Sequence, residues 1–236
     1  SPLPWGKGNP AVLAAIAQSL PLAVGVVISS IPLVVVTLTL LARQNKAAVL
    51  AFLLGWMAGI TLVGSLVLLL ADGTSRDPQT APGWLAWARV GVGVLLLGLA
   101  TRQWRSRPRN GAVAPQPAWM QMLDTLSVPK AGGLGLALTT VNPKNLLLVT
   151  AGALAILAAS PGPLGQWIAL AVFTAVASLG VAAPALAYLA LGERVAVPLA
   201  QTKAWIVQNN ATTMATVLLL LGLVVLGNGL GQLQAA

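Results

Sequence analysis

The chain has 236 residues, of which 57% are hydrophobic and only 7% are charged. Soluble domains average about 25% charged residues, so this composition excludes a soluble globular domain. The net charge of +9 would suit nucleic acid, but the basic residues lie mostly in short segments between apolar runs and indicate membrane orientation instead. The chain has no cysteine and no histidine, which excludes disulfides and the commonest metal ligand and general base. We expect no metal, no cofactor and no nucleic acid partner.

Six apolar runs are long enough to cross a bilayer, which takes roughly 20 residues in a helix. The runs are continuous rather than alternating, which favours helices over a barrel. The expected fold class is therefore an all-α polytopic membrane protein with six transmembrane helices, forming a single transmembrane domain over residues 1–236. The expected spans cover about residues 11–41, 47–71, 85–101, 131–159, 164–191 and 211–230.

The basic residues at the ends of the spans indicate which ends face the cytoplasm. Nine lie on one side and three on the other, and the side with the excess of lysine and arginine is cytoplasmic. We therefore expect a multi-pass protein of the plasma membrane with both termini outside the cytoplasm. The nine are Arg43, Lys46, Arg102, Arg105, Arg107, Arg109, Lys130, Arg194 and Lys203, and the three are Lys7, Arg76 and Arg89.

Two segments share a pattern that indicates an internal repeat. GVVISSIP and GLALTTVNP each begin with glycine, carry two adjacent hydroxyl residues and end in proline, at Pro32 and Pro143, and the second has the additional residue Asn142. Each copy would hold three spans, an odd number, so the copies would insert with opposite orientation, as in many transporters. We expect the first and fourth helices to be interrupted at the two prolines. The expected inverted repeats cover about residues 11–102 and 131–230, with a basic cytoplasmic loop over about residues 103–128.

The two prolines carry the chemistry of the expected site. Proline lacks an N–H and frees carbonyl groups in the preceding helical turn, and within lipid these groups need partners from protein or water. The helix that follows a break exposes its N-terminus, which attracts anions. We expect the two breaks to approach each other and to form a substrate-binding site. The polar side chains beside them are Ser29, Ser30, Thr139, Thr140, Asn142 and Asn145.

Lys144 is the only charged residue placed well inside an expected span. A lysine at the centre of a membrane helix costs roughly 2.5–3.5 kcal/mol on insertion scales, which favours a functional role. Asn142 and Asn145 are one turn apart and are expected to flank its ammonium group, and the four acidic residues are expected in loops or at span ends. The sequence therefore favours an anion-binding element at membrane depth. The alternatives are that Lys144 extends its ammonium group to the membrane surface, or that the break lies nearer the cytoplasmic face.

The longest connection between spans contains the basic segment RQWRSRPRN. We interpret this segment as a determinant of membrane topology whose arginines also contact lipid phosphates. These arginines are Arg102, Arg105, Arg107 and Arg109.

Five stretches of the chain resemble the GAP or sulfolipid-1-addressing protein (Sap) family of the LysE-type superfamily of small six-span exporters. They are LLARQNKAAVLAFLLGWMAG, LATRQWRSRPR, TTVNPKNLLLV, AVASLGVAAPALAYLALGER and KAWIVQNNATTM, and NPKN is the most distinctive element. The resemblance implies two three-helix repeats and a role in moving glycolipids across the plasma membrane or towards its outside. It carries over Asn142, Pro143, Lys144 and Asn145 as site residues, with Pro32 as the counterpart of Pro143. Amino-acid and metal-ion exporters of the superfamily often carry an acidic residue in a span, and its absence here argues against cation coupling through a carboxylate.

We therefore expect a transporter or flippase that exports an anionic lipid or glycolipid, with the lipid bilayer itself as a partner. Two alternatives stay open: a non-transporting scaffold for lipid-synthesis or export machinery, and an exporter of a small anionic or amphipathic metabolite. An enzyme is not expected, because the chain offers few groups for acid–base catalysis. A homo-oligomer and partners from lipid-synthesis or export machinery also stay open.

Overall fold

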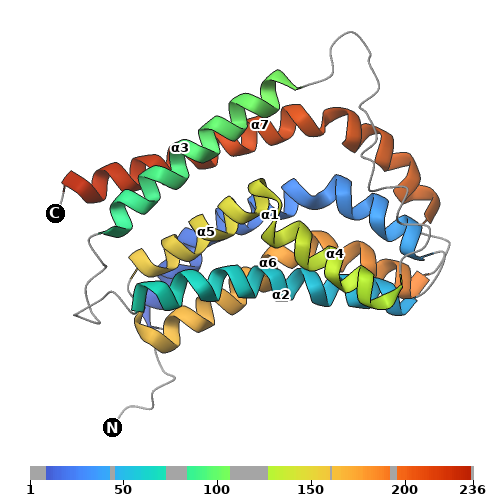
Figure 1. Cartoon of the computed structure of the whole chain (residues 1–236), viewed down its shortest axis with the longest axis horizontal. Helices are drawn as coiled ribbons and strands as arrows, with labels where there is room; N and C mark the ends of the chain where they lie inside the picture. Colours follow the sequence, from blue (N-terminus) through green and yellow to red (C-terminus); the bar gives the residue numbers. More distant parts are fainter. Residues whose placement is uncertain are drawn as a thin grey trace.

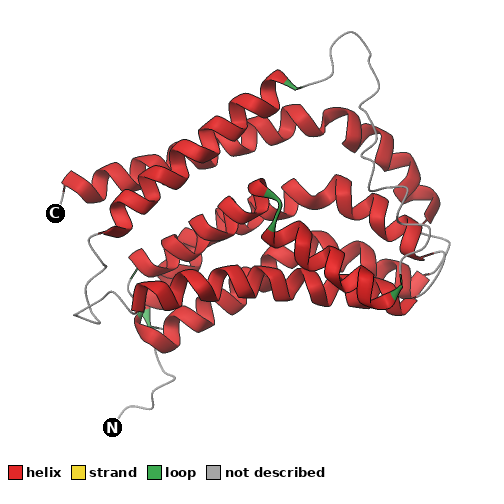
Figure 2. Ribbon diagram, in the orientation of Figure 1, coloured by secondary structure: helices red, strands yellow, loops and turns green. Residues whose placement is uncertain are grey.

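The computed structural model describes residues 9–42, 46–72, 84–106, 127–159, 161–191 and 196–234, without the side chains of residues 29–42, 71–72, 184, 188–189, 191 and 196–210. This part of the chain is almost entirely helical (Figure 2). Its helices are α1 (Pro10–Ala42), α2 (Lys46–Asp72), α3 (Trp84–Arg105), α4 (Val128–Thr140), α5 (Pro143–Ala158), α6 (Gly162–Leu191) and α7 (Ala196–Gln234).

The described helices are long and apolar enough for a multi-pass membrane protein. Five of them contain a segment that can cross a bilayer alone: α1, α2, α3, α6 and α7. The pair α4 and α5 passes the same test together, with a bend of 65° at the break between them. Counted as one broken span, this pair brings the number of candidate spans in the described residues to six.

The bent pair runs through the whole depth of the bundle. At its beginning, Gly132 of α4 packs against Ala51 and Gly55, near the start of α2. At its end, the carbonyl of Leu154 in α5 accepts a hydrogen bond from Arg89, near the start of α3. The starts of α2 and α3 lie at opposite ends of the bundle, because α3 follows α2 directly in the chain (Figure 1). The pair therefore behaves as one interrupted span rather than as a loop that returns to the same face.

The interruption expected at Pro32 is absent, because α1 continues as one helix from Pro10 to Ala42. Transmembrane helices tolerate proline, because neighbouring groups can satisfy the carbonyl that loses its hydrogen-bond partner. A new helix start needs a residue that caps it, and Asn142 supplies this cap before Pro143, whereas Ile31 precedes Pro32 and has no side-chain acceptor. The two halves of the chain therefore differ at this point, and the inverted repeat stays a prediction.

Helices α3 and α7 lie side by side and run antiparallel, beside the remaining helices (Figure 1). Glycines allow their backbones to approach. A Cβ atom added at Gly93 of α3 would meet the backbone of Leu226, and one added at Gly229 of α7 would meet the backbone of Val90 and Ala86. This pairing fixes the position of the polar end of α3, which lines the candidate site.

Glycines also bring α2 and α4 into backbone contact and thereby fix the end of α4 at the break. A Cβ atom added at Gly55 would meet the carbonyl oxygen of Gly132, and one added at Gly135 would meet that of Phe52. One turn further on, Gly59 faces the hydroxyl group of Thr139, so that even a methyl group would not fit between them. Small residues at such crossings are a common means of packing membrane helices.

The α2–α4 crossing predicts a position-specific effect of added side-chain volume. We expect Gly135→Val to lower the free energy of unfolding by about 1–3 kcal/mol or more, because the side chain has to displace backbone atoms of α2. Gly133→Val is the matched control on the same helix, since a Cβ atom there meets nothing within 4 Å. Thermal unfolding of the purified variants in detergent measures the difference. Equal melting temperatures for the two variants would contradict the crossing.

Candidate functional site

The break between α4 and α5 is formed by Asn142 and Pro143. Asn142 is the N-cap of α5: its backbone is extended, and its side-chain oxygen accepts a hydrogen bond from the backbone N–H of Lys144, at 3.2 Å. Pro143 occupies the first helical position, where its missing N–H costs nothing. The sequence NPK thus has the residue types that start a new helix, even though it lies within a long apolar stretch.

A second asparagine ties the new helix back to the old one. The side-chain amide of Asn145 donates a hydrogen bond to the carbonyl of Leu138, at 2.9 Å. Leu138 lies in the last turn of α4, where carbonyl groups lose their usual helical partners. Asn145 is fully buried, so an unpaired carbonyl at this place would be costly. The two asparagines therefore act first as the structural connection across the break.

The adjacent hydroxyl groups are bound within α4. Thr139 donates to the carbonyl of Leu136, at 2.8 Å, and Thr140 donates to the same carbonyl, at 2.9 Å. Thr139 is fully buried against Gly59 of α2. Both threonines were expected to contact the substrate; in the structure their hydroxyl groups donate to the end of the helix.

A cavity of about 270 Å³ opens where the break meets the polar end of α3. From α5 and its cap, Asn142, Pro143 and Lys144 line it. From the last turns of α3, the lining residues are Leu99, Arg102, Gln103 and Ser106. Two cations, Lys144 and Arg102, and the positive N-terminal end of α5 therefore face one hollow.

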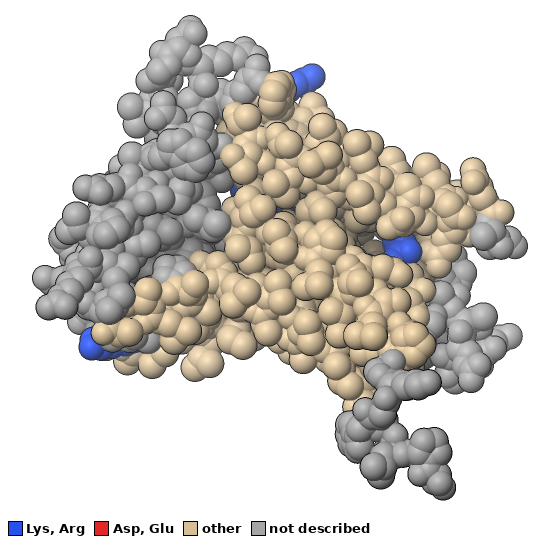
Figure 3. Space-filling model, turned by 180° about the vertical axis from the view of Figure 1, so that it is seen from behind, with Lys and Arg blue, Asp and Glu red and all other residues tan. Residues whose placement is uncertain are grey.

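The charge of this cavity is uncompensated within the part of the chain that the structure describes. None of the hydrogen bonds or ion pairs found there involves the ammonium group of Lys144, which is half-buried. The four acidic residues, Asp72, Asp77, Asp124 and Glu193, all have side chains outside the description. The described surface accordingly shows isolated basic groups and no acidic ones in the view of Figure 3. Such a cavity attracts anions.

The structure thus brings together only some of the residues expected at the site. Asn142, Pro143 and Lys144 line the cavity, and Arg102 joins them. Asn145, Thr139 and Thr140 lie behind it and hold the break, and Arg105 is exposed on the last turn of α3 without lining the cavity. Other expected site residues lie outside the described side chains: Ser29, Ser30, Pro32, Arg107 and Arg109.

Arg102 was expected in a cytoplasmic loop, as a contact for lipid phosphates. The helix α3 continues past the apolar run to Arg105, so Arg102 lies on a helix face directed at Lys144. Its spacing from Leu99 and Ser106, three and four residues away, places all three on that face. This helical spacing could have indicated the position of Arg102, because the polar residues RQWR can extend a helix as readily as they can begin a loop.

Arg89 is a second buried cation that the charge count placed at an outer helix end. Its side chain is 7% exposed. It donates to the carbonyl of Leu154 in α5, at 3.2 Å, and to the side-chain oxygen of Gln232 in α7, at 3.5 Å. Since it connects three helices, we assign it a structural role. Burial of a charge in this bundle is therefore not confined to the break, although Arg89 lies near the start of its span and Lys144 was singled out as the charge placed well inside one.

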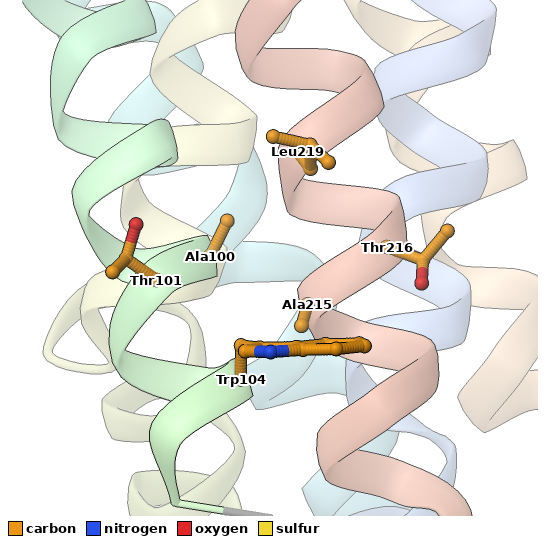
Figure 4. A pocket seen from close by; sticks show the side chains of 6 residues that line it. All are labelled: Ala100, Thr101, Trp104, Ala215, Thr216 and Leu219. Atoms are coloured by element: carbon orange, nitrogen blue, oxygen red, sulfur yellow. The ribbon is translucent and has the colours of Figure 1, made fainter.

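A second cavity, of about 310 Å³, lies between α3 and α7 on nearly the opposite face of α3 (Figure 4). Trp104 extends from α3 towards α7 across its floor, and the other lining residues are Ala100, Thr101, Ala215, Thr216 and Leu219. The hydroxyl groups of Thr101 and Thr216 donate to carbonyls of their own helices. This mainly apolar cavity has no charged lining, so the cavity at Lys144 is the better candidate for recognising a polar group.

These features define a multi-pass helical membrane protein with a cationic cavity beside a broken span. The sequence matches the family described as Sap, sulfolipid-1-addressing protein, over residues 20–231, and the chain belongs to that family. The family resemblance drawn from the sequence is thereby confirmed. Comparison with curated proteins gave no match, and comparison with solved structures gave none either.

The cap at the break predicts a graded response to substitution of Asn142. We expect Asn142→Ala to lower the free energy of unfolding by about 1 kcal/mol, because the N–H of Lys144 loses its acceptor. Asn142→Ser is the matched control, since serine supplies a capping oxygen and should retain most of the stability. The melting temperatures of the two variants in detergent check this. If alanine and serine prove equivalent, the cap has no role in stability.

Proposed function

We propose that the protein moves an anionic lipid or glycolipid across the plasma membrane, and that Lys144 and Arg102 bind the charged part of its headgroup. The observation that carries the proposal is the shared cavity, in which both cations and the N-terminal end of α5 face the same space. The family name and the membrane helices support a lipid-related role. That the protein transports the lipid is our proposal.

The composition of the cavity favours a monovalent or divalent anionic group over a neutral one. Lysine and arginine offer only hydrogen-bond donors, and Gln103, Ser106 and Asn142 add neutral groups around them. Unit charges 4 Å apart attract by about 4 kcal/mol at the effective dielectric near a protein surface, against about 1 kcal/mol in bulk water. Removal of one cation should therefore change the affinity for an anionic lipid strongly and the affinity for a neutral lipid little.

Lys144→Met tests this assignment, because methionine keeps much of the side-chain volume and removes the charge. We expect proteoliposomes with the parent protein to move phosphatidylglycerol that carries a fluorescent acyl chain, and those with Lys144→Met to do so at least about tenfold more slowly. Phosphatidylcholine with the same label should move slowly in both. Lys130→Met is the matched control, since Lys130 is exposed on α4 and does not line the cavity.

Asn142→Asp separates the role of charge from that of the fold. Aspartate is a good helix cap, so the break should stay intact. Its carboxylate would also lie beside Lys144 and repel an anion, so transport of the anionic lipid should fall while the melting temperature is kept. Transport at the parent rate by Lys144→Met would contradict the proposal. A parent protein that binds the anionic lipid without moving it would point to the scaffold alternative.

The proposed orientation follows from the excess of basic residues and has its own test. The chain has no cysteine, so a single introduced cysteine reports one position. We expect Ser75→Cys and Ser160→Cys to react with an impermeant thiol reagent added to intact cells, and Ser106→Cys to react only after the cells are opened. Rapid labelling of Ser106→Cys in intact cells would reverse the orientation and place the cation cavity at the outer face.

A further inference from the structure

Four polar atoms inside the bundle have no hydrogen-bond partner among the described residues, and the cavity at Lys144 does not include their side chains. They are Nε1 of Trp56 in α2, Oδ1 of Asn145 in α5, and the hydroxyl oxygens of Thr174 and Ser178 in α6. All four side chains are buried, none more than 5% exposed. Buried polar atoms almost always have partners, so a group of unpartnered ones requires an explanation.

The contacts between α2 and α6 place Trp56 and Ser178 at one level and Thr174 one turn away from them. Gly64 of α2 faces the side chain of Leu170 in α6. The two helices pack against each other and run antiparallel (Figure 1). Steps of four residues along the facing ridges, about 6 Å each, then bring Thr174 opposite Ile60 and Ser178 opposite Trp56.

The same reasoning adds Asn145 from α5. Gly152 faces the ring of Phe173, and α5 runs antiparallel to α6 because only a short turn connects them. Moving back from Gly152 by two turns of α5 and forward along α6 by the same length brings Asn145 within about one turn of Ser178. The four unpartnered atoms therefore lie within about two turns of one another along α2, α5 and α6, three helices that contact one another.

The hydroxyl groups of Thr174 and Ser178 differ from others in the described helices. Ser19, Thr101 and Thr216 each donate to a carbonyl three or four residues earlier in their own helix. Such back-bonding is the ordinary way for a hydroxyl group to find a partner inside a helix. Thr174 and Ser178 lie one turn apart on the same face of α6 and do not use it. Their oxygens are thus available to a group that enters between the helices.

We propose that Trp56, Asn145, Thr174 and Ser178 form a second, uncharged polar site that binds hydroxyl groups, those of water or of a polyol headgroup. The indole N–H is only a donor, which disfavours a cation, and the free amide oxygen is only an acceptor, which disfavours an anion. A hydroxyl group both donates and accepts and matches the whole set. Because the four atoms are buried, an occupant that comes from outside needs a path that opens between the packed helices.

Cysteine accessibility tests the site in the full-length protein. Ser178→Cys and Thr174→Cys each place one thiol in a chain that has no other. Thiols react as thiolates, which need water, so in nanodiscs of phosphatidylcholine we expect both to react with aminoethyl methanethiosulfonate about tenfold faster than Ala177→Cys does. Ala177 is the matched control, since it is a fully buried apolar neighbour on the same helix. Hydroxyl-radical oxidation of Trp56 in the parent protein gives the same information without a substitution.

Added lipid distinguishes the two sources of the hydroxyl group. If a polyol headgroup binds, monoglucosyl diacylglycerol in the nanodisc should slow the labelling of Ser178→Cys, while phosphatidylcholine with the same chains should not. If water alone binds, labelling stays fast with either lipid. Labelling as slow as that of Ala177→Cys, together with an unoxidised Trp56, would overturn the proposal. The same labelling rates are expected in a Lys144→Met background. The experiment can therefore contradict the uncharged site without contradicting the anion site, and the reverse.

Discussion

Hydrocarbon offers no hydrogen bonds, so the irregular backbone between α4 and α5 has to find its partners within the protein. Asn142 binds the first free N–H of α5, and Asn145 binds a carbonyl that α4 can no longer pair. These two bonds allow a 65° bend inside a span that otherwise runs through the whole bundle. The remaining features of the site depend on this bend, because it directs the start of α5, with Lys144, at the polar end of α3.

The position of Lys144 explains how a lysine is tolerated within an apolar span. Its side chain lines a cavity that polar residues of α3 also line. Arg102 adds a second charge of the same sign, which no structural requirement of the bundle explains, and an anion between the two would compensate both. Asn145 connects the break to the uncharged group of Trp56, Asn145, Thr174 and Ser178: its side-chain N–H holds the break, while its oxygen remains free.

The sequence predicted the helical spans well because length and apolarity alone decide whether a helix can cross a bilayer. The sequence predicted a break at both prolines, because a proline by itself does not show whether a helix ends there or continues. The difference is the preceding residue: Asn142 caps a new helix before Pro143, whereas α1 continues through Pro32. The cavity that Arg102 lines and the buried contacts of Arg89 were missed, because charge counting assigns residues to helix ends and ignores the neighbouring helices. Trp56, Thr174 and Ser178 were missed because ordinary membrane helices contain such residues, and only the packing of α2 against α6 brings them together.

The central claim is that the ammonium group of Lys144 directly contacts a lipid anion. Solid-state NMR in bilayers can measure this contact as the dipolar coupling between the phosphate ³¹P of phosphatidylglycerol and ¹⁵N-labelled lysine side chains. The account predicts a coupling that corresponds to about 4–6 Å in the parent protein and that disappears in Lys144→Met, although the other lysines remain labelled. An unchanged coupling in Lys144→Met would assign the contact to another lysine and contradict the account.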